Sequence, residues 1–200
     1  MKYEITNEKK RGSRYSLTLY RIRALKNFSK VKAGDLGGWI EGESNLSQEG
    51  KAWVSGDAQV YGDARVSEDA QVSGKAWVYG DAEVFGNARV SGDAEVFGNA
   101  QVYGDAKVSG DAKVSGDAVV FGNARVSGDA QVSGKAWVSG NAWVSGNAWV
   151  YGNAKVDGKV KVYGNAEVFG NAKVSGKAWV SGDAKVSGDV KVSGNDQISD

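Results

Sequence analysis

The chain has 200 residues, of which 25 are lysine or arginine and 24 are aspartate or glutamate, giving a formal net charge of +1. It contains no cysteine, histidine or proline, which excludes disulfides, thiolate catalysis and metal sites built on cysteine or histidine. No segment has the apolar length of a signal-peptide core or a membrane span. We therefore expect a cytoplasmic or virion-associated protein with no membrane partner.

The charge is unevenly distributed along the chain. Residues 1–32 carry ten lysines and arginines against two glutamates, a net charge of +8, so the remaining residues sum to −7. A basic N-terminal segment thus precedes an acidic remainder, and the acidic part would repel any polyanion that the basic part attracts.

The first 35 residues do not follow the pattern of the rest of the chain. Residues 3–5 and 15–25 are rich in β-branched and aromatic side chains, and the turn-forming segment 9–13 lies between them. This predicts a basic β-hairpin over residues 1–35 that caps the first turn of the following array, whose end would otherwise expose unpaired backbone groups. Six cations of this cap are candidate contacts for nucleic acid or another polyanion: Lys9, Lys10, Arg11, Arg14, Arg21 and Arg23.

Residues 36–200 form the second predicted region, in which a repeat begins before it becomes regular. Ile40 and Leu46 are six residues apart, and Ser44 takes the small inward position between them. The spacing from Leu46 to Val54 is eight, so we expect two extra residues near Glu49 to bulge out at a corner.

From position 54 to position 198, every sixth residue is valine, except for isoleucine at the last site. The unit reads Val-(Ser/Tyr/Phe)-Gly-(Asp/Asn/Lys)-Ala-x. Side chains alternate between the two faces of a strand, so valine and alanine point the same way, and glycine followed by Asp or Asn forms a corner. Each hexad is therefore predicted to be a strand of four residues and a turn. A period of six does not fit a helix.

A longer period of 18 residues separates three kinds of site. When the residues that follow the aliphatic positions are sorted by this period, one class is serine at eight of nine positions, with Tyr163 as the exception. The other two classes hold eight aromatic residues among sixteen sites. This segregation indicates an 18-residue turn with three distinct faces, and about eight turns in all.

The hexad resembles the repeat of left-handed parallel β-helix proteins, and residues 19–41 and 45–54 resemble the start of uncharacterised YdcK-like bacterial and prophage proteins. The resemblance covers the whole chain. It implies an all-β, left-handed, triangular parallel β-helix with an N-terminal β-hairpin cap. It also favours a homotrimer and a prophage origin. Left-handed winding would be an exception to the usual right-handed crossover rule.

Two aromatic columns are predicted on the outer surface. The candidate self-association face contains Phe85, Tyr103, Val119, Phe121 and Trp137. The second column contains Tyr61, Trp77, Tyr79 and Phe97. Such rows either strengthen the sheet by cross-strand stacking or form a contact surface, with stacking on sugar rings as a third interpretation.

Charged columns have simpler interpretations. Asp93, Asp111 and Asp129 align at one corner and could hold a cation, but we expect them to be solvated, with Lys75 relieving the repulsion between Asp57 and Asp93. On the serine-rich face, the basic sites are expected to be solvated, although they could attract a polyanion: Arg89, Lys107, Arg125 and Lys161.

These patterns favour a non-catalytic, rigid solenoid that acts as a structural or protein-interaction module, with no cofactor and an unknown protein partner besides itself. One alternative is an acyltransferase-like hexapeptide enzyme, but the resemblance implies a histidine base, and the chain has none. The other alternative is nucleic-acid binding through the basic cap. Ice binding is disfavoured because the repeat contains no threonine.

Overall fold

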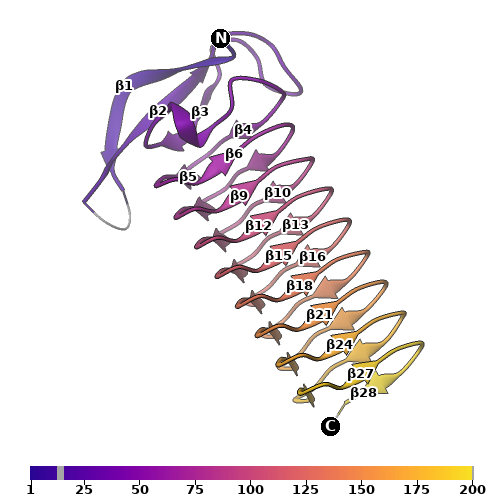
Figure 1. Cartoon of the computed structure of the whole chain (residues 1–200). Coiled ribbons are helices and arrows are strands. Elements are labelled where there is room, and N and C mark those ends of the chain that lie inside the picture. Colours follow the sequence, from indigo (N-terminus) through magenta and orange to yellow (C-terminus); the bar gives the residue numbers. More distant parts are fainter. Residues whose placement is uncertain (13–15, 200) are drawn as a thin grey trace.

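The computed structural model describes residues 1–12 and 16–199, and Arg14 of the predicted cation set lies outside them. The described chain forms a stacked coil of short strands with a hairpin at its N-terminal end (Figure 1). None of its described segments is a helix that is long and apolar enough to cross a membrane. The prediction of an all-β solenoid is confirmed.

The coil has three sides, each a parallel sheet, which we call face 1, face 2 and face 3 in the order in which the regular array visits them from residue 53 onward. Face 1 consists of β4 (Trp53–Val54), β7 (Gln71–Val72), β10 (Arg89–Val90), β13 (Lys107–Val108), β16 (Arg125–Val126), β19 (Trp143–Val144), β22 (Lys161–Val162), β25 (Trp179–Val180) and β28 (Gln197–Ile198). Face 2 continues from the hairpin through β3 (Leu36–Ile40), β5 (Gln59–Val60), β8 (Trp77–Val78), β11 (Glu95–Val96), β14 (Lys113–Val114), β17 (Gln131–Val132), β20 (Trp149–Val150), β23 (Glu167–Val168) and β26 (Lys185–Val186). Face 3 consists of β6 (Arg65–Val66), β9 (Glu83–Val84), β12 (Gln101–Val102), β15 (Val119–Val120), β18 (Trp137–Val138), β21 (Lys155–Val156), β24 (Lys173–Val174) and β27 (Lys191–Val192).

The strand register confirms the turn of 18 residues. Val102 pairs with Val84 in the preceding turn and with Val120 in the next. Around it, the amides of Gln101 and Tyr103 donate to the carbonyls of Ala118 and Val120 at 2.9 and 3.0 Å. Face 1 contributes one strand per turn and has nine strands, so the coil has about nine turns, close to the predicted eight.

The interior is filled by the predicted columns. Valines at the sixth positions and alanines two residues before them are buried along the array. Val160 stands at an alanine site and is also fully buried, whereas Val190, at the same kind of site in the last turns, is 47% exposed. A close-packed interior of methyl groups leaves no space for larger or polar side chains.

The corners differ from the prediction in two respects. Each hexad contributes a strand of two residues rather than four, and at the described corners the positive φ falls on the glycine position, not on the Asp, Asn or Lys after it. At Gly104, φ is +69°, and an added Cβ would lie 3.0 Å from the backbone nitrogen of Gly122. Glu68 takes the glycine position once, with φ +59°, and its carboxylate accepts the amide of Gly86 at 2.8 Å.

The cap is a hairpin of β1 (Tyr3–Arg11) and β2 (Thr18–Ala24), joined antiparallel to β3, which pairs parallel with β5. The predicted turn was therefore placed too early, because Lys9 to Arg11 belong to β1. Tyr3 and Lys2 close the first turn of the coil. The hydroxyl of Tyr3 donates to the Leu46 carbonyl at 2.7 Å, and the Lys2 ammonium donates to the Ala52 carbonyl at 2.8 Å.

The irregular first turn contains a short 3₁₀ turn, η1 (Glu43–Asn45). The sequence placed Ser44 inward, but Ser44 is exposed and Asn45 is buried, because η1 shifts the phase by one residue. The Asn45 side chain accepts the amides of Glu41 and Gly42 and donates to the carbonyls of Gly62 and Ala64. It thereby replaces the missing strand contacts of this turn.

Candidate functional site

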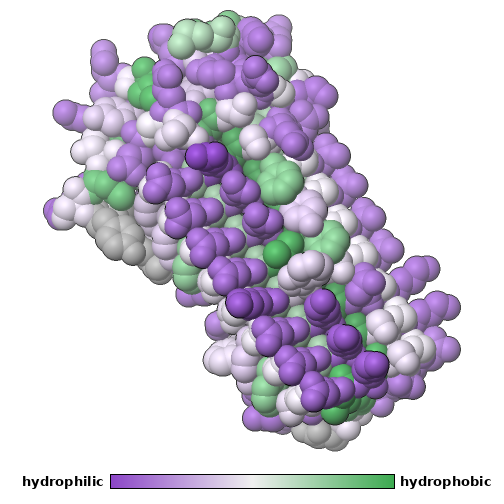
Figure 2. Space-filling view, in the orientation of Figure 1, coloured by the Kyte–Doolittle hydropathy of each residue, from purple (hydrophilic) through white to green (hydrophobic). Residues whose placement is uncertain are grey.

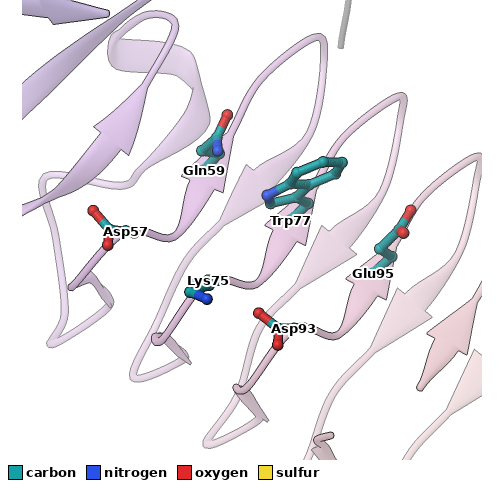
Figure 3. Close-up of a pocket in the computed structure, with 6 residues that line it drawn as sticks. All are labelled: Asp57, Gln59, Lys75, Trp77, Asp93 and Glu95. Atoms are coloured by element: carbon teal, nitrogen blue, oxygen red, sulfur yellow. The ribbon is translucent and has the colours of Figure 1, made fainter. Parts of the chain in front are cut away.

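A shallow hollow of about 350 Å³ lies on face 2 near the cap. Figure 3 shows the corner residues Asp57, Lys75 and Asp93 along one side of it, and Gln59, Trp77 and Glu95 on the strands beside them. Lys75 stands between the two aspartates, as predicted. Within the described residues, no group of three ligating side chains is placed to hold a metal ion. The corner is therefore an alternation of charges on an open surface.

The candidate self-association face is assembled on face 3. Phe85 stacks on Tyr103 and Tyr103 on Phe121, with ring centroids 4.8 and 5.1 Å apart and nearly parallel planes. Trp137 meets Phe121 edge-on at 6.1 Å and is 45% exposed. Val119 lies beside them in β15. The three stacked rings are half-buried, which fits cross-strand stacking, while Trp137 extends the row to a more exposed edge.

The second aromatic column lies on face 2, and the cap covers its start. Tyr61, Tyr79 and Phe97 stack at 5.1 and 5.0 Å, and Trp77 packs beside them. Leu19 and Trp39 of the cap region join the same cluster, so Tyr61 is only 1% exposed. The sequence pattern predicted two equivalent outer columns, whereas the structure buries part of this one under β2 and β3.

The cap cations mostly have partners within the chain. Lys10 lies over the Trp39 ring at 4.4 Å, and burial is the main cause that lowers its pKa. Arg21 contacts the same ring and lies 3.8 Å from Glu8. Arg23 pairs with Glu4, and Arg11 donates to Ser16 at 2.8 Å. Lys9 is exposed on β1. A polyanion would have to compete with these contacts.

The carboxylates with shifted pKa values are shifted downward. A hydrogen bond from Lys51 lowers the pKa of Asp69. A hydrogen bond from Lys185 is the main cause that lowers the pKa of Glu167, with a further contribution from Tyr151. A general base needs a pKa raised toward neutrality, so these groups act as ion-pair partners along the faces.

Face 1 presents an aromatic row that the sequence reasoning missed. Trp143 and Trp179 are 44% and 39% exposed on β19 and β25, with Lys161 on β22 between them. The signal was available in the sequence, because residues 143, 161 and 179 are 18 apart and each precedes a valine. On the side of the molecule that Figure 2 shows, hydrophilic side chains form rows along the coil, with more apolar side chains between the rows.

Comparison of the sequence with known proteins also identifies the repeat region as a β-solenoid. Residues 58–74, 120–134 and 136–152 match the family described as YdcK Beta solenoid repeat. In these three segments the array is similar to YdcK-type repeats. A relative from Escherichia coli (strain K12), described as an uncharacterized acetyltransferase YdcK, is 36% identical over 59 residues. That similarity covers 26% of this chain and 18% of the relative, so it reaches less than a fifth of that protein. The predicted resemblance to the YdcK-like group is confirmed.

Proposed function

We propose that this protein of YdcK-type repeats is a rigid, non-catalytic interaction module that associates with itself through face 3. The observation that supports the proposal is the aromatic row from Phe85 to Trp137, which lies outside a core that is already closed. A solenoid whose valine and alanine columns are complete does not need these rings for its interior. Contiguous apolar rows on an outer surface mark contact sites.

We propose a homotrimer, in which three rods turn face 3 toward a shared axis. Light scattering should then give the mass of three chains of 21.0 kDa. Tyr103→Glu places a charge in the middle of the row and should release monomers that remain folded by circular dichroism. Ser109→Glu adds the same charge at the corresponding position of face 1 and should leave the trimer intact. A monomeric parent protein, or equal dissociation of both variants, would reject the self-association.

The non-catalytic part of the proposal has its own test. The name of the E. coli relative refers to acetyl transfer, so acetyl-coenzyme A is the probe to use. The chain has neither histidine nor cysteine, and the carboxylates with shifted pKa values are held in their ionised form. We expect no heat of binding in calorimetry with acetyl-coenzyme A. Saturable binding with a stoichiometry of one per chain would favour the acyltransferase alternative.

A further inference from the structure

Face 1 changes character along its length. In its middle, the outward residues of β10, β13 and β16 are Arg89, Lys107 and Arg125, and the adjoining corner carries Asp93, Asp111 and Asp129. Further along, the outward residues become Trp143, Lys161 and Trp179, and the same corner becomes Asn147, Asn165 and Asp183. Exposed rings and amides thus replace charged side chains of both signs, while the fold of the face is unchanged.

The two tryptophans are held in place on either side of a hollow. Trp143 pairs with Lys161 and Lys161 with Trp179 in adjacent strands, so the two indoles are separated by two strand spacings, ~10 Å. The indole nitrogen of Trp143 donates to the hydroxyl of Ser127 at 3.2 Å. Between the rings lies an open hollow of about 250 Å³, which Tyr163 and Ser145 also line.

Lys161 brings a positive charge into this hollow. Its ammonium lies 4.4 Å from the centre of the Trp179 ring, and Tyr163 meets the same ring edge-on at 6.5 Å. A lysine over an aromatic face is a cation–π contact, which keeps the charge next to the ring. A ligand in the hollow would therefore meet aromatic surface and an ammonium group together.

The surrounding corner strengthens the positive charge. Six lysines lie on the adjoining part of face 3, on the corner that leads to face 1 and on β22: Lys155, Lys159, Lys161, Lys173, Lys177 and Lys191. Three acidic residues, Asp157, Asp189 and Asp196, lie in the same region, and Asp157 accepts a hydrogen bond from the Ser139 hydroxyl at 2.9 Å. The local field therefore attracts anions, although the array as a whole is acidic.

On the opposite corner, asparagines form a ladder. The Asn147 amide donates to Asn165 at 3.0 Å, and the Asn165 amide donates to Asp183 at 2.8 Å. Each amide group offers two donors and an acceptor with two lone pairs, so the ladder leaves hydrogen-bonding capacity directed outward. Sugar hydroxyls, which both donate and accept, match such groups.

We propose that this part of face 1 binds an acidic polysaccharide, a chain of sugar rings that carry carboxylates or sulfates. The apolar faces of sugar rings stack on Trp143 and Trp179, an acid group lies at Lys161, and the asparagine ladder bonds hydroxyls along one side. A single-stranded nucleic acid fits less well, because its backbone needs a continuous basic groove, and here Trp143 and Trp179 interrupt the line of cations on face 1. The site goes beyond the self-association proposed above, which uses face 3.

The test is a binding titration followed by fluorescence anisotropy with labelled oligogalacturonate, which carries carboxylates, and labelled heparin fragments, which carry sulfates. A neutral cello-oligosaccharide and oligo-dT are the comparison probes. We expect at least one acidic glycan to bind. Trp143→Ala, Trp179→Ala and Lys161→Glu should each weaken that binding about tenfold, and added salt should weaken it too.

Matched variants distinguish binding at this site from nonspecific binding elsewhere on the surface. Trp149 is 46% exposed in the same turn but on face 2, so Trp149→Ala should leave the affinity unchanged. Lys135→Glu makes the same charge change at the corner between faces 2 and 3 and should have less than a twofold effect. The proposal is overturned if neither acidic glycan binds, if oligo-dT alone binds, if the neutral probe binds as tightly as the acidic ones, or if Trp149→Ala loses as much affinity as Trp179→Ala. Because Trp143→Ala, Trp179→Ala and Lys161→Glu leave face 3 intact, the oligomeric mass of these three variants reports separately on self-association.

Discussion

In the repeat array each turn repeats the contacts of the turn before it, whereas the cap depends on a few side chains that occur once. Val102 in the array has equivalents six residues away in both directions, all buried. Lys2, Tyr3 and Asn45 at the cap end have no such equivalents. The side chain of each forms hydrogen bonds to more than one backbone group of the first turn. The array should therefore lose stability locally and evenly along its length, while the cap should be sensitive at single positions.

The largest effect is expected for a charge in the middle of the array. Val102→Asp buries an unpaired carboxylate, which costs about 3–5 kcal/mol, and should open the neighbouring turns. Hydrogen exchange would show lost protection in β9, β12 and β15. Gln101→Asp changes the adjacent, outward residue of β12 and is the control, with an expected change below 1 kcal/mol. Equal effects of the two variants would contradict the inward assignment of the valines.

The cap should respond to pH through Lys2. Burial is the main cause that lowers the pKa of Lys2 from its ordinary 10.5 to about 8. Below pH 8 this lysine is charged in both states, and the cost of burying the charge is fully present. Between pH 8 and 10.5 the unfolded state binds more protons, so the free energy of unfolding should rise with pH, by up to about 3 kcal/mol.

Tyr3 acts in the opposite direction at higher pH. Burial raises its pKa from 10.0 to about 12, so above pH 10 the unfolded state loses its proton first and stability falls. Urea unfolding from pH 7 to 11 should therefore give a maximum near pH 10. In Lys2→Met the rise below that maximum should be reduced, and a rise as steep as in the parent would exclude Lys2 as its source.

A smaller loss is expected when Asn45 is truncated. Asn45→Ala removes the side-chain partner of the Gly42 amide and of the Gly62 and Ala64 carbonyls, while the Glu41 amide keeps its bond to the Val60 carbonyl, at a cost of about 2 kcal/mol. Hydrogen exchange should increase at η1 and β6 but not beyond β12, because the array does not depend on this contact. Ser44→Ala, at the exposed neighbouring position, should leave both stability and exchange unchanged. Loss of protection throughout the coil would mean that the cap and the array unfold as one unit.

The smallest effect concerns the corners. Gly104→Ala forces a Cβ onto a residue with φ +69° and into contact with Gly122, which should cost about 1–2 kcal/mol. Glu68→Gly is the reverse case, since it relieves a positive φ but removes the hydrogen bond to Gly86, so its net effect should be close to zero. Thermal unfolding of both variants would measure the difference. A stabilising Gly104→Ala would contradict the close approach of successive corners.

The fold could be predicted because the same six-residue pattern repeats through most of the chain. A valine every six residues with alanine two before it leaves a single way to hide the methyl groups, and the period of 18 gives the turn. The cap was less predictable, since the exposure of Ser44 and the burial of Asn45 depend on a 3₁₀ turn that breaks the phase, and Lys2 is buried against the expectation for lysine. The structural positions of the cap occur once in the chain, so no repeated pattern in the sequence shows whether their side chains are buried.

The surfaces were predicted in part for a related reason. The ring columns at Tyr103 and Tyr79 follow directly from the 18-residue period, and the structure stacks them. The burial of Tyr61 and Tyr79 does not follow from it, because β2 and β3 cover the start of face 2, and the path of the hairpin is not encoded in the repeat. The row of Trp143, Lys161 and Trp179 obeys the same period and could have been found by sorting the residues before valine as well.

The three-sided turn also limits how the length of this chain can change during evolution. Loss or gain of one hexad would keep every valine inside, yet it would rotate all later residues by one side, so that Trp143 and Trp179 would no longer continue the line of Arg125. Loss or gain of three hexads would shorten or lengthen the rod and leave each surface continuous. Chains of this type should therefore differ in length by multiples of 18 wherever a surface on one side is under selection, and by six where only the interior is.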